Sequence, residues 1–471
     1  MFPVRDFEGR NVAVFGLGRT GIAAAKALAA GGAHVLAWDE NEDTRAAAEK
    51  AGIALEDLGR RDWGDIAALA LSPGVPLTHP SPHRMVEFAR TVGAEVIGDM
   101  ELFARTINTL PEAERPSVVG ITGTNGKSTT TALVGHILKK AGRDVHVGGN
   151  IGDAVLGLPA PRPGAVYVLE LSSYQLDLTH SLTCDVAILL NLSPDHLDRH
   201  GDMDGYLKAK KRIFANQAAS HTAIIGVDDD YTRGVCTALM SAGPMKVVPV
   251  SSGRALSRGV YALGGKVHDA TQGHAELGAD LSASPALPGR HNGQNAAAAF
   301  AAARALGVNA RTIAQAMKSF PGLPHRAERV GQKDGIVIVN DSKATNADST
   351  AQALGCYQTI YWIAGGQAKA GGIEPLRPYF PRIAKAYLIG EAQDAFARTL
   401  GKDVAYDKAG TLENALDLAL RDAAEGGRDN PVILLSPACA SFDQFKSYEH
   451  RGDVFRALVQ NRLSGPERGA A

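Results

Sequence analysis

The most informative stretch of the sequence is GITGTNGKSTT, at residues 120–130. The apolar, β-branched run VVGIT at 118–122 is typical of a buried strand, and residues 130–142 have a helical periodicity that ends at Gly142. Gly123 and Gly126 let the loop between them adopt positive φ, so its N–H groups can point inward at phosphate oxygens. The sequence therefore predicts a strand, loop and helix that bind ATP.

The loop also carries the polar side chains that such a site needs. Lys127 would reach the outer phosphates, and Ser128 would hold Mg²⁺. A strict GxxxxGK[ST] motif requires glycine at position 121, which is Ile121 here, so the motif is a shortened variant. We expect ATP to contact the whole loop, namely Gly123, Thr124, Asn125, Gly126, Lys127, Ser128 and Thr129.

Composition limits the other possibilities. A chain of 471 residues has room for about three domains. Lys and Arg number 49 against 50 for Asp and Glu, so no basic excess suggests nucleic acid, and a small-molecule substrate is expected. Four widely spaced cysteines indicate free thiols, and no signal peptide or membrane-length apolar run is visible. We expect a monomeric cytoplasmic protein without membrane insertion.

The N-terminal segment has a GxGxxG turn. The strand NVAVF, the turn GLGRTG and a strand ending at Asp39 form a βαβ unit, which by itself predicts a dinucleotide-binding dehydrogenase. Only about 98 residues precede the next module, which leaves room for one nucleotide-sized site. We expect the glycines to cradle a diphosphate of the substrate, together with a second loop at Ser72, Pro73 and Gly74.

Strands and helical patterns alternate through the rest of the chain, which favours an α/β fold with mostly parallel sheets. The region from Val248 to Pro288 is weakly patterned. We expect three domains: a Rossmann-like substrate-binding domain at 1–98, a central P-loop ATPase-like parallel-sheet domain at 99–322, and a Rossmann-like α/β domain at 323–471 that binds the amino acid.

Glu170 ends the strand VYVLE, and His196 follows the strand VAILLNLS. Both are therefore expected at the carboxyl edge of the sheet, beside the P-loop, where they could ligate Mg²⁺ with Ser128. Lys208, Lys210 and Lys211 cluster in one helix. Two of the three are expected to be solvated, and the sequence does not say which one differs.

The third segment places two lysines in loops of small residues directly after apolar strands. Lys343 lies in NDSKATN and Lys369 in GGQAKAGG, and each offers a point charge for a carboxylate or phosphate. Arg326 stands at the entry to this segment, and SPACASFDQF follows its final strand with small residues near Ser441. Their shared position at strand ends favours a ligand site.

Several motifs together resemble one family. TGTNGKST, LELSSYQL, NLSPDHLDRH, YLKAKKRIF, GRHNGQN, GLPHRAE, NDSKATN and LLSPACASFDQF occur in the order typical of the Mur ligases of peptidoglycan synthesis. The resemblance covers nearly the whole chain, and the third-segment motifs are similar to those of the members that add D-glutamate. It implies an ATP-dependent ligase that adds D-glutamate to UDP-N-acetylmuramoyl-L-alanine (UDP-MurNAc-L-Ala) through an acyl phosphate, in the synthesis of the cell wall.

The resemblance also implies site residues. Lys127, Lys210 and His196 would be catalytic, with two Mg²⁺ ions held by Ser128 and Glu170 and by His196 and Lys210, the latter as a carbamate. Nucleotide contacts beyond the loop would come from Asn292, Asn295, Arg326 and Asp341. The UDP-sugar site would comprise Gly18, Arg19, Thr20, Glu40, Ser72, Gly74, Asn150, Ser172 and Gln175. The D-glutamate site would comprise Lys343, Thr345, Lys369, Ser441, Phe442 and Tyr448.

Two residues depart from the family pattern, and three other functions share part of the sequence pattern. Phe442 stands where the family has leucine, and Tyr448 where it has phenylalanine, so both departures fall in the expected D-glutamate pocket. A folylpolyglutamate synthase-like ligase shares the P-loop but lacks an N-terminal UDP-binding domain. A non-enzymatic nucleotide-binding regulator leaves Glu170, His196 and the loop lysines unexplained, and a dehydrogenase rests on GxGxxG alone.

Overall fold

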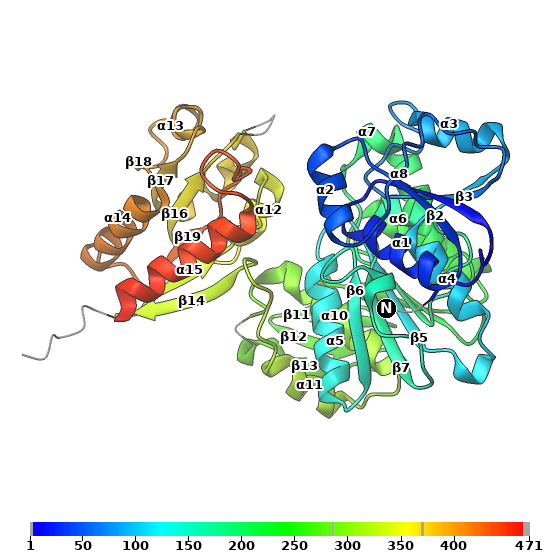
Figure 1. Cartoon of the computed structure of the whole chain (residues 1–471). Coiled ribbons are helices and arrows are strands. Elements are labelled where there is room, and N and C mark those ends of the chain that lie inside the picture. The colour runs from blue at the N-terminus through cyan, green and yellow to red at the C-terminus, as the bar shows by residue number, and fades with distance from the viewer. Residues whose placement is uncertain (1–2, 285, 369–371, 465–471) are drawn as a thin grey trace, which may run out of the picture. The chain divides into compact units, whose positions relative to one another are not determined.

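The computed structural model describes residues 3–284, 286–368 and 372–464 and has the expected α/β class (Figure 1). It divides into two compact units: residues 1–283 with 293–319, and residues 284–292 with 320–471. Lys369 lies outside the described residues. No helix in the described part of the chain is long and apolar enough to cross a membrane.

The first unit contains two sheets, of which the N-terminal one is parallel and has the order β2-β1-β3-β4. Helices connect its short, apolar, parallel strands, as a Rossmann-like fold requires. The strands are β1 (Asn11–Phe15), β2 (His34–Trp38), β3 (Ile66–Leu71) and β4 (Glu95–Ile97), and the helices are α1 (Arg19–Ala30), α2 (Glu42–Lys50) and α3 (Arg84–Thr91).

The second sheet has the order β13-β12-β11-β10-β9-β8-β5-β7-β6. It is parallel from β6 to β11, and β12 and β13 add an antiparallel end. The weakly patterned region thus holds short strands, half exposed at the sheet end. The strands are β5 (Ser117–Thr122), β6 (Asp144–Gly149), β7 (Ala165–Glu170), β8 (Val186–Leu189), β9 (Thr222–Gly226), β10 (Lys246–Ser251), β11 (Val260–Leu263), β12 (Lys266–Asp269) and β13 (Glu276–Asp280).

Helices cover this second sheet, and α5 begins at the P-loop and packs on β6 and β7. The face of α5 toward the sheet is apolar, including the buried Leu133, Val134 and Ile137. The helices are α4 (Asp99–Asn108), α5 (Lys127–Lys140), α6 (Ser173–Asp177), α7 (Leu197–His200), α8 (Met203–Lys211), α9 (Asp230–Ala242), α10 (Gly289–Ala305) and α11 (Ala310–Lys318).

The second unit contains a sheet of order β14-β15-β19-β16-β17-β18, parallel except for β14. Apolar side chains from both faces of the sheet form its cores, with Trp362 and Phe455 fully buried. The strands are β14 (Glu328–Lys333), β15 (Ile336–Asn340), β16 (Thr359–Gly365), β17 (Ile383–Ile389), β18 (Tyr406–Gly410) and β19 (Pro431–Leu435), and the helices are α12 (Ala347–Leu354), α13 (Gln393–Leu400), α14 (Leu412–Glu425) and α15 (Tyr448–Ser464).

Strand direction brings the predicted residues of the first unit to common edges. β5, β7 and β8 are parallel neighbours, so the P-loop, Glu170 and the segment that leads to His196 leave the sheet at the same edge. In the N-terminal sheet the loops after β1 and β3 likewise leave side by side. Parallel sheets bind ligands at such carboxyl edges.

Candidate active site

The P-loop has the backbone that its glycines predict. Gly123 and Gly126 have φ of 147° and 84°, and a Cβ on Gly126 would lie 2.2 Å from Oδ1 of Asn295. The Thr130 hydroxyl also donates to Asn295 Oδ1, at 3.2 Å. Asn295, which lies in α10, therefore lies against the loop, so a side chain at position 126 would displace it.

Lys127 is the first residue of α5, and its amine lies over the loop. Nζ donates to the carbonyl oxygens of Gly123 at 2.9 Å and Thr124 at 2.8 Å. Ser128 follows it and is buried. The helix N-terminus, the loop amides and this ammonium together form a positively polarised cradle suited to phosphate.

Lys210 is the lysine that differs from its neighbours. Lys208 and Lys211 are exposed, whereas Lys210 is 1% exposed. Its Nζ donates to the Gly123 carbonyl at 2.9 Å and lies 4.7 Å from the centre of the Tyr206 ring. Burial lowers the pKa of this amine well below its usual range, and the nearby Lys127 charge lowers it further.

Glu170 ends β7 and is buried beside the P-loop. Its Oε1 accepts a hydrogen bond from Asn150 Nδ2 at 2.7 Å, while Oε2 is buried without a hydrogen-bond partner among the described residues. The carboxylate also raises the pKa of Lys210, so the two groups interact electrostatically. A buried, unpartnered carboxylate oxygen at the phosphate cradle suits a hard cation such as Mg²⁺.

His196 precedes α7 in a left-handed conformation, with φ of 54°. Its Nδ1 lies 2.8 Å from the hydroxyl of Tyr174. Burial lowers the pKa of the imidazole; the Asp195 carboxylate raises it, and the Lys127 and Lys210 charges lower it. The net shift is downward and favours the neutral imidazole, which is the form that ligates metals.

No group of three His, Cys, Asp or Glu side chains that could hold a metal occurs within residues 3–284, 286–368 and 372–464. A metal at this edge would therefore need other donors as well, such as Ser128, ATP phosphates or a modified Lys210. Of these donors, Ser128 and a carbamylated Lys210 are the ones that the family resemblance implies, and they stay a prediction. Of the remaining nucleotide-site residues, Asn292, Arg326 and Asp341 belong to the second unit, and their part in the site stays a prediction.

In the N-terminal sheet the glycines build the turn. Gly16 has φ of 88°, and a Cβ there would lie 2.5 Å from the Ser72 Cβ. A Cβ on Gly21 would lie 1.9 Å from the Gly16 carbonyl oxygen. Asp39, in the position of the acidic residue of dinucleotide folds, accepts a hydrogen bond from the Leu17 amide at 2.6 Å and so braces the loop. Gly18, by contrast, is exposed at the start of α1.

Polar contacts join these loops to the second sheet. Arg19 Nη2 donates to the Asn150 carbonyl at 3.2 Å. Arg199, in α7, donates to the carbonyls of Gly74 and Val75, both at 2.8 Å. Sequence reasoning missed Arg199, because only its place in the motif SPDHLDRH singles it out and its reach to another loop cannot be read from a sequence.

The other predicted substrate residues lie around these loops. Glu40 lies 3.2 Å from the Arg84 guanidinium. Ser172 and Gln175 form a capping box at the start of α6, with Gln175 Nε2 buried and without a partner among the described residues. Thr20 is half-buried in the first turn of α1.

In the second unit Lys343 and Tyr448 meet. Lys343 Nζ donates to the Tyr448 hydroxyl at 2.9 Å and lies 4.8 Å from the ring centre. The Thr345 amide donates to the Lys343 carbonyl, Ser441 is buried, and the Phe442 side chain is 69% exposed. The tyrosine hydroxyl gives Lys343 a contact that the phenylalanine of the family pattern lacks.

Asp341 and Arg451 organise the same loops. Burial raises the pKa of Asp341 to about 7, although Ser436 Oγ donates to it at 2.8 Å. Arg451 is fully buried in α15 and donates to the carbonyls of Ser342 at 2.8 Å and Cys439 at 3.2 Å. Arg451 thus joins the loop of Lys343 to the loop of Ser441. Sequence reasoning missed it because arginines on helices are mostly solvated.

Taken together, the fold and the first-unit site define a nucleotide-binding protein of the P-loop class. Residues 121–303 match the Mur ligase middle domain, and residues 325–439 match the glutamate ligase domain of Mur ligases.

Relatives that match over their full length point to the same family. The chain is 58% identical over 465 residues to the UDP-N-acetylmuramoylalanine--D-glutamate ligase of Phenylobacterium zucineum, covering 99% of both chains. It is 57% identical over 470 residues to the ligase of that name from Caulobacter vibrioides, covering 100% of both. The chain therefore belongs to the Mur ligase family.

A solved structure has the same fold. The UDP-N-acetylmuramate-alanine ligase of Thermotoga maritima matches with a TM-score of 0.57 at 18% identity, covering 96% of this chain and 99% of that one. At this level of identity the likeness concerns the fold alone.

Proposed function

We propose that this protein is an ATP-dependent ligase that joins D-glutamate to UDP-MurNAc-L-Ala. The observation that carries the proposal is the meeting of Lys127, Lys210, Glu170 and His196 at one sheet edge, beside a loop shaped for phosphate. The full-length relatives, which bear the name of this reaction, support the choice of substrates.

The residues suit a phosphoryl transfer followed by an acyl transfer. The alanyl carboxylate attacks the γ-phosphorus of ATP, giving an acyl phosphate and ADP. The amine of D-glutamate then attacks the acyl carbon, forming the amide and releasing phosphate. Lys127, held at the loop by two carbonyl groups, places a fixed positive charge where the transferred phosphoryl group develops negative charge.

Lys210 fits a carbamate better than an ordinary ammonium. Burial lowers the pKa of this amine and so favours its neutral form, whose lone pair can attack CO₂, forming an N–C bond and releasing one proton. The product is an anion beside the Lys127 charge. We assign it, with His196, to one Mg²⁺ and Ser128 with Glu170 to another. When bound, Mg²⁺ would neutralise charge on the phosphates.

The remaining predicted residues are assigned to substrate. Gly18, Arg19, Thr20, Glu40, Ser72 and Gly74 would hold the uridine and diphosphate, with Asn150, Ser172 and Gln175 at the muramoyl-alanine end. In the second unit Lys343, Thr345, Ser441, Phe442 and Tyr448 would hold D-glutamate, and Asn292, Arg326 and Asp341 would contact the nucleotide with Asn295. We assign the reaction to the cytoplasm, with a monomeric enzyme.

The test is phosphate release from ATP in the presence of UDP-MurNAc-L-Ala, with and without D-glutamate. We expect release that depends on both substrates, and a product heavier than the nucleotide sugar by one glutamyl residue. L-Glutamate in place of D-glutamate is the matched control and should support little release. Release driven by a folate and L-glutamate would instead support a folylpolyglutamate synthase-like enzyme.

A further inference from the structure

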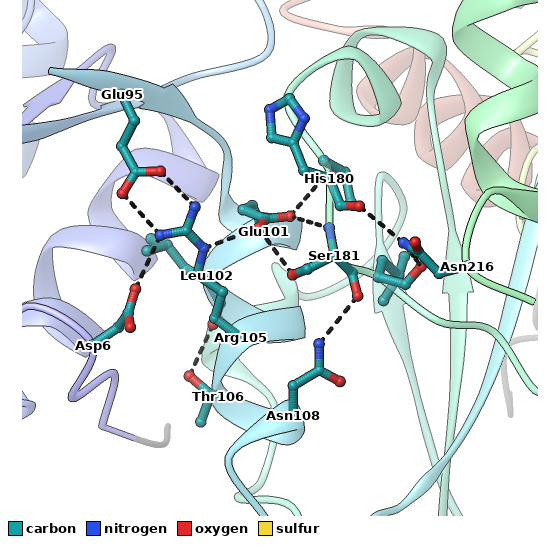
Figure 2. A network of polar contacts seen from close by, with 12 residues as sticks. Asp6, Glu95, Glu101, Leu102, Arg105, Thr106, Asn108, His180, Ser181 and Asn216 are labelled. Carbon is teal, nitrogen blue, oxygen red and sulfur yellow. Dashed lines mark hydrogen bonds and ion pairs between the residues drawn. The ribbon is translucent and has the colours of Figure 1, made fainter. Parts of the chain in front are cut away.

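An ion-pair network that is buried at Glu101 and partly exposed at its other members lies between the N-terminal sheet and the second sheet of the first unit, called the central sheet below (Figure 2). Its centre is Arg105 in α4. The guanidinium pairs with Glu95 of β4, with Nη1 at 2.8 Å from Oε1, and its Nη1 also lies 3.0 Å from Asp6. Both carboxylates belong to the N-terminal sheet and its leading segment. Arg105 therefore attaches α4 to that sheet.

Glu101, the next residue of the network, joins Arg105 to the loop at 178–182. It is 1% exposed and accepts hydrogen bonds from the amides of His180 at 2.6 Å and Ser181 at 2.8 Å, and from Arg105 Nε at 2.9 Å. Burial raises the pKa of this carboxyl, but the hydrogen bonds outweigh burial and the net shift is downward. Glu101 is thus a charged acceptor that fixes the loop at 178–182.

That loop is held from its other side by the segment that follows α8. Arg212 Nε donates to the Thr179 carbonyl at 3.1 Å, and Asn216 Nδ2 donates to the His180 carbonyl at 2.8 Å. The loop directly follows α6, which carries Gln175, and α8 carries Lys210. The network therefore runs without interruption from the N-terminal sheet to the two helices that bear predicted substrate and catalytic residues.

We propose that Glu101 and Arg105 are a positioning pair that sets the distance between the diphosphate loops of the N-terminal sheet and the catalytic edge of the central sheet. The inference rests on the proposed function, because it needs a substrate that reaches both sheets. UDP-MurNAc-L-Ala is such a substrate, with its nucleotide at the first sheet and its alanyl carboxylate at the second. Neither residue is among those assigned to the substrate.

The physical reason is that a ligand with two anchoring ends gains affinity only if both anchors lie at the matching separation. Weakening the Glu101–Arg105 contact between the two sheets, called the joint below, leaves each binding site intact. It reduces the effective concentration of one end of the substrate at its site. By the proposed assignment, UDP contacts the N-terminal sheet and not the central sheet. ADP contacts the P-loop, α10 and the second unit, and not the N-terminal sheet. Their affinities should therefore not depend on the joint, whereas that of the whole substrate should.

The experiment begins with the full chain and three variants. Glu101→Gln removes the charged acceptor of the loop, Arg105→Ala removes the attachment to the N-terminal sheet, and Arg162→Ala is a control that breaks an exposed ion pair with Asp144. Titration calorimetry with UDP, ADP and UDP-MurNAc-L-Ala gives three dissociation constants for each protein. We expect the whole substrate to bind about tenfold more weakly to Glu101→Gln and Arg105→Ala, with UDP and ADP changed less than twofold.

Arg105→Lys keeps one charge and should recover part of the loss, and the double variant should be no weaker than the worse single variant, because both residues act through one joint. If Glu101→Gln fails to fold, the Arg105 variants decide alone. Unchanged affinity for the whole substrate, or an equal loss for UDP and ADP, would overturn the positioning role. UDP that does not bind the parent protein at all would instead refute the proposed substrate site.

Discussion

Replacing Lys210 tests the proposed carbamate most directly. Lys210→Met removes the amine and keeps most of the side-chain length, since methionine is one atom shorter than lysine, whereas Lys210→Ala also leaves a cavity. A ligand lost from a preorganised site lowers turnover on the order of a hundredfold to a thousandfold. Both variants should therefore be nearly inactive in phosphate release, while Lys208→Ala, an exposed lysine on the same helix, should keep its activity.

The structure also gives the expected effect on stability. The Lys210 amine donates two hydrogen bonds, to Gly123 and to Thr122 at 3.3 Å, each worth about 1 kcal/mol. Removing the amine also removes the cost of burying it, so the net change in the free energy of unfolding for Lys210→Met should be within about 2 kcal/mol. Its unfolding midpoint should therefore stay close to that of the parent.

Rescue by small carboxylates separates the two variants. Acetate should restore part of the activity of Lys210→Ala, because it can enter the cavity and replace the anionic group, but not that of Lys210→Met, whose side chain fills the space. A ¹³C resonance from labelled CO₂ should appear in the parent and in neither variant. Full activity of Lys210→Met would refute the reasoning, as would equal rescue of both variants.

Three other changes test other parts of the site. Lys127→Ala should lower turnover at least a hundredfold with an unchanged fold, measured by steady-state kinetics and circular dichroism; normal turnover would remove the phosphate role. Tyr448→Phe removes the hydroxyl bonded to Lys343 and should change the KM for D-glutamate several-fold and that for ATP little, whereas an effect on ATP alone would place the pair at the nucleotide. Burial lowers the pKa of His200 to about 4, so between pH 6.5 and 4 the folded protein binds fewer protons than the unfolded chain, and its stability should fall as the pH drops through this range. Thermal melts across this range should show a smaller loss of stability for His200→Gln than for the parent, and identical pH profiles of the two proteins would contradict this.

The sequence predicted the α/β class and the elements around the P-loop well, because glycines, apolar strands and helical periodicity are local signals. It also placed Glu170 and His196 at the proper edge, since strand ends can be read from the apolar pattern. The weakly patterned region after Val248 was not resolved, because its strands are only four to six residues long and partly exposed.

Residues that act through distant partners could not be found in this way. Lys210 was singled out only through the family resemblance, because it differs from Lys208 only in the depth at which the folded helix places it. Arg105, Arg199 and Arg451 are ordinary polar residues in the sequence. Apart from Glu101, which lies four positions from Arg105, their partners lie 10 to 126 positions away. Such contacts depend on the packing of complete sheets, which no local pattern encodes.

The strand order of the third sheet bears on how the protein is made. β19, the last strand in the described part of the chain, lies between β15 and β16, which are synthesised earlier. On the ribosome the second unit therefore lacks its central strand until residue 435 has emerged, and Arg451 and Tyr448 emerge later still. The first unit can fold while synthesis continues, since domains fold as units from the N-terminus. A nascent chain stopped before β19 would expose the edges of β15 and β16 that β19 otherwise pairs with. Premature termination in this region should therefore yield an aggregation-prone product rather than a partly active one.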